Sequence, residues 1–441
     1  MFKPSTPSVD LRGKTPLDLQ HLKYGLFLKR RFWPIFAATF LGTFNDNLLR
    51  SGLVVLIAYS ASHGVLLPAR PEILVTLCSA LLVLPMLLFS SVAGALADKY
   101  EKSRLVRLAK LAEIGIMSGA CYGFAARDVP LLMGLLFVSG THTTFYSPIK
   151  FSLLPDHLTH GELLAGNGFM AGGIYLSVLF GLIAGGLLVD LPGDVIGETA
   201  LTVACLGILA SLFIPLSSVA HSGMRIQWHL WRGSKEIIFH ASRDKRVLLS
   251  ILGLSWYTLV GSVFMSQFAN YAQGVVRGDN EVYILFLTIF SIGIAVGALL
   301  CDWLLKGQVS PKLTPLTALA VSLFTYMLVA ATPHPGPAPL QDVQSFVTAP
   351  QHWLLLAAML MVAVSGGIYM VPLYAMLQSH TPAEYRSRIM AASNLSDSVF
   401  MTVAALVSAG LLSLGLRITD LFLLVATLNL GVACYARRFT A

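Results

Sequence analysis

Long hydrophobic blocks recur along the chain and restrict its fold more than any other feature of the sequence. The blocks are roughly 20 to 30 residues long, and about 20 apolar residues are enough for a helix to cross the roughly 30 Å hydrocarbon core of a bilayer. Only 12% of the 441 residues are charged, against roughly 25% in a soluble domain, and the mean hydropathy is +0.73. The sequence therefore predicts an all-α integral membrane protein.

The hydrophobic blocks predict twelve transmembrane helices, which a basic connection divides into six and six. The predicted spans cover residues 32–60, 73–97, 105–125, 130–151, 164–189, 198–219, 247–273, 281–305, 313–332, 352–378, 386–414 and 418–436. The chain then has four parts: a basic N-terminal segment (1–31), a first six-helix bundle (32–219), an amphipathic linker (220–246) and a second six-helix bundle (247–441). The N-terminal segment does not resemble a cleavable signal, so we expect the first span to stay in the membrane.

The Lys and Arg residues lie mainly on one side of the predicted membrane. The opposite side has only four of the 30, namely Arg70, Arg127, Arg277 and Arg417. The positive-inside rule therefore predicts that the N- and C-termini are both cytoplasmic. Because most of the basic residues lie between spans, we expect them to contact anionic membrane lipids and expect no nucleic-acid partner.

The first span carries a polar cluster near its middle, Asn45-Asp46-Asn47 followed by Arg50. An ionisable residue at the centre of a span costs at least about 2.5–3.5 kcal/mol on insertion scales, so it usually faces a partner or a polar cavity. One interpretation is an ion pair within the helix, since Arg50 lies one turn after Asp46. The other is a site for a polar ligand, which would also use the two flanking asparagines.

The end of the fourth span offers a second candidate for the same site. Tyr146 and Pro148 precede Lys150, and the proline frees backbone groups of the helix. Lys150 either extends to the cytoplasmic headgroups or points between the bundles, as a cation opposite Asp46.

Polar residues of the second bundle can line the opposite wall. Gln267 lies in the seventh span, and Asn394 and Asp397 lie in the eleventh. An acid inside a span, such as Asp397, usually marks a functional site. Lys110 and Glu113, three residues apart in the third span, instead predict a structural ion pair.

The two halves show a weak repeat and a loop motif. "VAGALADKY" ends the second span and "AVGALLCDW" ends the eighth. Parallel six-span repeats are typical of the major facilitator architecture, in which two bundles rock around a central site. The stretch Gly94-x-x-x-Asp98-Lys99-x-x-Lys102-x-Arg104 resembles the loop motif of that superfamily, where the acid caps a neighbouring helix. The resemblance implies a major facilitator superfamily fold and a gating role for these five residues.

Pairs of glycines four residues apart occur in the fifth and eighth spans. Small residues at this spacing let helices approach closely in lipid. In the architecture that the chain resembles, these two spans face one another, so the glycines either lie at the contact between the bundles or, as we expect for most of them, serve close helix packing alone. The pairs are Gly168 and Gly172, Gly181 and Gly185, and Gly293 and Gly297.

Within the superfamily, the chain resembles bacterial lysophospholipid transporters and the transporter domains fused to acyl-glycerophosphoethanolamine acyltransferase / acyl-carrier-protein synthetases. The similar stretches include "FLGTFNDNLLRSGLVVLI", "FYSPIKFSLLPD" and "NLSDS". The resemblance implies movement of lyso-phosphatidylethanolamine and lyso-phosphatidylglycerol across the inner membrane to the cytoplasmic leaflet for reacylation. It carries the family's polar site residues over to Asp46, Lys150 and Asp397. It also implies a separate acyltransferase as partner; we expect a monomer without cofactor or metal.

Three alternatives remain open. A drug or small-metabolite exporter of the same fold is the nearest, although Leu182 stands where drug–proton antiporters carry an essential proline. An integral membrane acyltransferase is disfavoured because no His is followed by Asp at the His-x-x-x-x-Asp spacing, so we expect no enzyme. A third is a subunit that only anchors an acyltransferase.

Met265 stands where stand-alone lysophospholipid transporters can have an arginine. This difference leaves the headgroup preference open.

Overall fold

The computed structural model describes residues 25–58, 67–68, 70–189, 191, 194–217, 230–333 and 339–437. Predictions for the remaining residues, which include most of the N-terminal segment and the first part of the linker, lie outside this range. The described chain is helical and has no strand. Its twelve long helices are α2 (Trp33–Ala58), α4 (Pro71–Lys99), α5 (Lys102–Ala125), α6 (Val129–Ser152), α8 (Leu163–Leu188), α9 (Val195–Leu212), α11 (Lys245–Asn270), α12 (Asn280–Leu304), α13 (Thr314–Ala330), α15 (Trp353–His380), α16 (Arg386–Ser413) and α17 (Ile418–Ala436).

These helices follow the twelve predicted spans in order. The largest difference is in the sixth span, which was expected to reach residue 219, whereas α9 ends at Leu212. Pro215 follows closely, and a proline disfavours helical conformation in the residue before it. Within the described residues, nine helices are long and apolar enough to cross a membrane by length and composition. The other three long helices are α2, which contains Asp46 and Arg50, α5, which contains Lys110 and Glu113, and α6, which contains Lys150.

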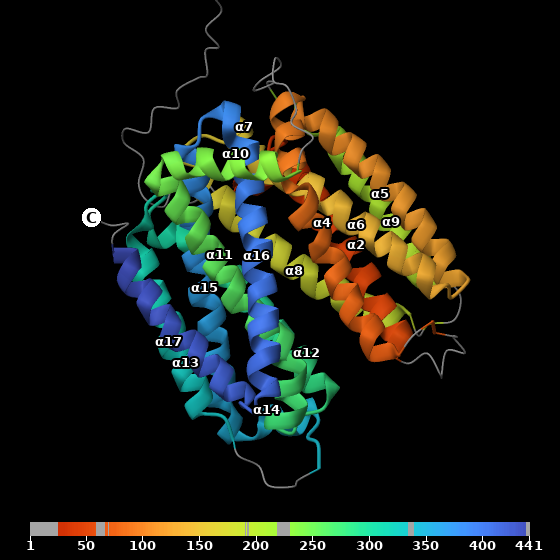
Figure 1. The fold of residues 1–441 in the computed structure, drawn as a ribbon, viewed down its shortest axis with the longest axis vertical. Coiled ribbons are helices and arrows are strands. Elements are labelled where there is room, and N and C mark those ends of the chain that lie inside the picture. The colour runs from red at the N-terminus through yellow and green to blue at the C-terminus, as the bar shows by residue number, and fades with distance from the viewer. Residues whose placement is uncertain are drawn as a thin grey trace, which may run out of the picture.

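Figure 1 shows two bundles that lean apart from one another. The first contains α2, α4, α5, α6, α8 and α9, and the second contains α11, α12, α13, α15, α16 and α17. Between them, α8 packs on α12 and α15, while α16 packs on α4 and α6. Helices α5 and α9 form the outer edge of the first bundle. This is the predicted architecture of two six-helix bundles.

One end of the molecule is marked by two additional helices, α7 (Leu154–His157) and α10 (Leu230–Arg243), both near the top of Figure 1. Helix α10 packs on α4, α11 and α16 and so contacts both bundles. It buries Ile237 and leaves Phe239 57% exposed, as expected of an amphipathic linker helix. We call this end the basic end, and the positive-inside rule predicts that it is cytoplasmic.

The glycine pairs divide between different neighbours. Gly168 and Gly172 lie against the backbone of α12, as predicted, because a Cβ on either would contact Ala298 or Ala295. The other two pairs pack inside a bundle, as the interpretation of close packing alone predicts. Gly181 and Gly185 lie against the backbone of α2, and Gly293 and Gly297 lie against α15. The spacing indicates close packing but does not identify the partner helix.

Candidate functional site

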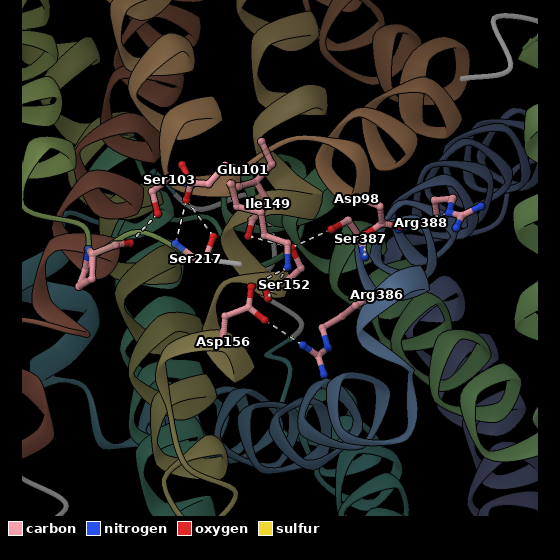
Figure 2. Close-up of polar contacts among 12 residues, drawn as sticks. Asp98, Glu101, Ser103, Ile149, Ser152, Asp156, Ser217, Arg386, Ser387 and Arg388 are labelled. Carbon is pink, nitrogen blue, oxygen red and sulfur yellow. Dashed lines mark hydrogen bonds and ion pairs between the residues drawn. The ribbon is translucent and has the colours of Figure 1, made fainter. Parts of the chain in front are cut away.

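Asp98, near the end of α4, binds the first turn of α16 in the other bundle (Figure 2). Its Oδ1 accepts a hydrogen bond from the Ser387 backbone N–H at 2.8 Å, and its Oδ2 accepts from the Arg388 N–H and Nε, both at 3.1 Å. A helix N-terminus has unpaired N–H groups and a dipole that favours a negative charge. Gly94, one turn earlier, permits the close approach, since a Cβ there would lie 2.6 Å from the Ala391 Cβ.

A second acid, Asp156 in α7, joins the same two bundles. Its Oδ1 accepts from Arg386 Nη1 at 3.0 Å, and its Oδ2 accepts from Lys102 Nζ at 2.7 Å. Lys102 is only 2% exposed, and the Ser387 hydroxyl donates to the Ser152 hydroxyl alongside. Neither Asp156 nor Arg386 is among the site residues predicted from the sequence. The one signal for Asp156 was its position in the stretch "FYSPIKFSLLPD".

The other two basic residues of the predicted gating motif lie outside this contact. Lys99 Nζ lies 5.7 Å from the centre of the Tyr100 ring. The Arg104 side chain is 76% exposed, with Nε 3.9 Å from Glu101 Oε2. Burial alone would raise the pKa of Glu101. Hydrogen bonds from backbone N–H groups, the largest contribution coming from Ser217, outweigh the effect of burial and hold the pKa below its usual value. Gating roles for Lys99 and Arg104 stay predictions.

Two further contacts join the bundles deeper in the molecule. Asn167 and Gln378 exchange two buried amide hydrogen bonds of 2.7 and 2.8 Å. The Phe151 ring stacks on Tyr374 with ring centres 4.6 Å apart and planes 7° apart. Among the described residues, every hydrogen bond between the bundles lies on the basic-end side of this stacked pair, which we call the Phe151–Tyr374 junction. The molecule is therefore closed at its basic end.

Asp46 points from α2 toward α6. Its Oδ1 accepts from Ser139 Oγ at 2.6 Å and its Oδ2 accepts from Thr143 Oγ1 at 2.7 Å. It is also the acid whose charge acts on Lys150. Within the described part of the chain, Lys150 Nζ has no hydrogen bond or ion pair, and it lies 5.3 Å from the centre of the Phe151 ring. This position favours the interpretation that Lys150 points between the bundles.

Asn45 points away from Asp46, into the interior of the first bundle. Its Nδ2 donates to Glu113 Oε1 at 3.0 Å and to the Ala200 carbonyl at 3.1 Å. Glu113 forms the predicted ion pair with Lys110 at 2.6 Å, and both side chains are at most 1% exposed. Lys110 Nζ also lies 5.2 Å from the centre of the Tyr146 ring. The structure thus places Asn45 and Tyr146 in a polar network that joins helices of one bundle.

The remaining residues of the first cluster have partners on α2 itself or on α4. Asn47 donates to the Thr43 carbonyl of its own helix at 2.8 Å. Arg50 donates to Ser79 Oγ of α4 at 3.4 Å, and within the described chain it forms no ion pair with Asp46. The interpretation of an internal Asp46–Arg50 pair is therefore wrong for this conformation, because Asp46 binds the hydroxyls of α6 instead.

In the second bundle, Asp397 lies near Tyr374 of the Phe151–Tyr374 junction. It is 7% exposed, its Oδ1 accepts from Ser255 Oγ at 2.6 Å, and its charge acts on the Tyr374 hydroxyl. Asn394, one turn earlier on α16, is 9% exposed. Gln267 lies twelve residues beyond Ser255 on α11, a rise of roughly 18 Å, so the structure does not bring it to Asp397.

The sequence model of a protein family, the Major Facilitator Superfamily, matches residues 35–347 of this chain. The chain belongs to that superfamily of transporters. A Citrobacter koseri protein named Lysophospholipid transporter LplT is 26% identical over 412 residues, which cover 88% of this chain and 92% of that protein. A Serratia proteamaculans protein of the same name is 23% identical over 402 residues, covering 89% and 90%.

Solved structures of other transporters share the fold. The human organic anion transporter MFSD10 superposes with a TM-score of 0.71 at 12% identity, over 91% of this chain and 98% of that one. The Escherichia coli fucose:proton symporter FucP gives a TM-score of 0.66 at 14% identity, over 93% and 98%. At these identities the superpositions show the fold alone, and the fold agrees with the prediction made from the repeat and the loop motif.

Proposed function

We propose that this transporter moves lysophospholipids across the bacterial inner membrane to the cytoplasmic leaflet, where a separate acyltransferase reacylates them. The proposal rests on one observation above all: Lys150, whose ammonium has no hydrogen bond or ion pair in the described chain, lies beside the Phe151–Tyr374 junction. The names and coverage of the similar bacterial proteins support the same substrate class.

The charges near the junction suit the headgroup of such a lipid. A phosphate forms strong charge-assisted hydrogen bonds with a lysine, and Lys150 has its donors available. Ser139 and Thr143 fix the carboxylate of Asp46, which is near enough for its charge to act on Lys150. Asp397, on the opposite bundle, is an acceptor for the amine of lyso-phosphatidylethanolamine or the hydroxyls of lyso-phosphatidylglycerol. The acyl chain would remain in apolar surroundings.

Rocking of the two bundles provides the movement. The described contacts between the bundles close the basic end, so this conformation would receive a headgroup from the opposite side of the membrane. Breaking the contacts of Asp98 and Asp156 with α16 would then open the basic end and release the headgroup there. The cycle needs no covalent step, in agreement with a transporter rather than an enzyme.

The test is transport of a fluorescent lyso-phosphatidylethanolamine by the purified protein in liposomes. Lys150→Ala and Asp46→Asn should each lower the initial rate at least about tenfold, the effect of roughly 1.4 kcal/mol. Lys312→Ala, at an exposed site, and Asp420→Asn, in an exposed ion pair, are matched controls and should transport like the wild type. The assignment of the site would be contradicted if folded Lys150→Ala or Asp46→Asn protein transported the lysolipid at the wild-type rate. A drug exporter would be favoured if the wild-type protein exported dyes but moved no lysolipid.

A further inference from the structure

A groove on the outer side of the first bundle takes no part in the proposed transport site. It lies between α4, α5 and α6 and has a volume of about 570 Å³. Of its lining residues, only Thr141 and His142 are polar. Helix α5 is at the outer edge of the bundle in Figure 1, and Leu108 and Leu111 beside the groove are 62% and 58% exposed. The groove therefore faces the membrane.

The groove is hollow because α5 has small residues on successive turns there. Ala109, Ala112 and Gly115 line it, and a Cβ added at Gly115 would have no atom within 4 Å. From Leu105 near the basic end to Gly115, α5 rises roughly 15 Å. This is about half of the roughly 30 Å hydrocarbon core, and so about the depth of one leaflet. The length and the apolar lining fit an acyl chain of the leaflet at the basic end.

Two cations lie where the headgroup of such a lipid would be. Lys99 is the last residue of α4 and follows the residues of that helix that line the groove. Its Nζ lies 5.7 Å from the centre of the Tyr100 ring. Arg104 immediately precedes Leu105, and its side chain is 76% exposed, with Glu101 as a single carboxylate at 3.9 Å. Both cations belong to the loop motif, yet neither has a described contact with the second bundle. Basic side chains at a membrane surface attract anionic headgroups.

We propose that this groove binds one acyl chain of an anionic phospholipid from the leaflet at the basic end, with Lys99 and Arg104 holding the phosphate. The volume lies within the roughly 300–1,000 Å³ of small-molecule sites. The occupant is a resident membrane lipid and not the transported lysolipid, so the site is independent of the proposed function.

The test uses the full chain in liposomes that contain phosphatidylglycerol with a photoreactive group in its acyl chain. After illumination, crosslinked peptides should map to α4, α5 and α6 around the groove. Gly115→Leu places a side chain in open space within the groove and should reduce this crosslinking at least fivefold. Gly431→Leu is the matched control, because Gly431 on α17 is exposed and a Cβ there also meets nothing within 4 Å.

The headgroup contact is tested with the double variant Lys99→Gln/Arg104→Gln, which changes side chains at the edge of the molecule and leaves the groove intact. It should reduce crosslinking of phosphatidylglycerol about fivefold and leave that of a photoreactive phosphatidylethanolamine unchanged. Equal crosslinking of the two lipids by the wild-type protein would overturn the proposal, as would equal crosslinking by the Gly115→Leu and Gly431→Leu proteins. Either result would mean that the groove holds bulk lipid without selection.

Discussion

Lys110 and Glu113 show how a polar helix is stabilised inside a membrane bundle. The two side chains are fully buried and paired at 2.6 Å, and Asn45 gives the carboxylate a further hydrogen bond. The i, i+3 spacing made this pair predictable from the sequence. The role of Asn45 was not predictable in the same way, because its partners Glu113 and Ala200 belong to helices that are distant in the chain.

Removing one member of this buried pair should destabilise the protein. Lys110→Met leaves an uncompensated carboxylate, and breaking a buried ion pair in this way typically costs about 3–5 kcal/mol. Replacing both residues, in Lys110→Met/Glu113→Leu, removes both charges and should recover most of the loss. Thermal unfolding in detergent, followed by tryptophan fluorescence, measures both variants. A single variant as stable as the wild type, or a double variant less stable than the single one, would contradict this account.

At the scale of elements, the sequence located the twelve long helices but not all of their neighbours. Hydrophobic length determines where a helix can span a membrane, and that information is local. The side on which a glycine pair packs depends on the tertiary arrangement. Thus α8 uses Gly168 and Gly172 against α12, and uses Gly181 and Gly185 against α2 of its own bundle. The resemblance to the superfamily predicted the first contact correctly.

The α8–α12 contact should control closure of the basic end. A Cβ at Gly168 would lie 2.6 Å from the Ala298 carbonyl oxygen, so Gly168→Val should push the two helices apart. Gly186→Val is the matched control on the same helix, since a Cβ there would lie 3.7 Å from Ser51 Oγ, an ordinary contact. Spin labels at Tyr100→Cys and Ala383→Cys, in a background without native cysteines, report the opening by double electron–electron resonance.

In that measurement, Gly168→Val should increase the population with a long label-to-label distance, and Gly186→Val should leave the distribution of the parent protein unchanged. The substitution is the same in both variants, so its effect on helix propensity cancels in the comparison. Similar distributions for the two variants would mean that the α8–α12 contact does not restrain the basic end.

For the whole molecule, the sequence predicted two bundles and a gating motif, but it did not predict which end is closed. That property depends on contacts between segments nearly 300 residues apart, such as Asp98 with Ser387. The candidate site was predicted in part. Asp46 and Lys150 are close enough for their charges to interact, whereas Arg50 and Gln267 lie elsewhere along their helices. An unusual residue type reveals that a position matters, and only the packing shows what it contacts.

Asp98 joins the two bundles through three hydrogen bonds from the first turn of α16, so we expect it to stabilise the closed state. Asp98→Asn preserves the shape but removes the charge that the helix dipole and Arg388 stabilise. A hydrogen bond to a charged group contributes about 1.5–3 kcal/mol, so the ratio of open to closed molecules should rise roughly ten- to a hundredfold.

The same spin-label pair measures this ratio. Asp420→Asn is the matched control, because Asp420 pairs only with Arg417 among the described residues and both belong to the start of α17. The control should give the parent distribution, while Asp98→Asn should add a long-distance population. If the transporter works by rocking, the Asp98→Asn protein should also transport more slowly. The headgroup site is exposed to the opposite side of the membrane only while the basic end is closed, and in this variant the basic end is closed less often. An unchanged distance distribution for Asp98→Asn would show that the other contacts, Asp156 with Arg386 and Asn167 with Gln378, keep the basic end closed without it.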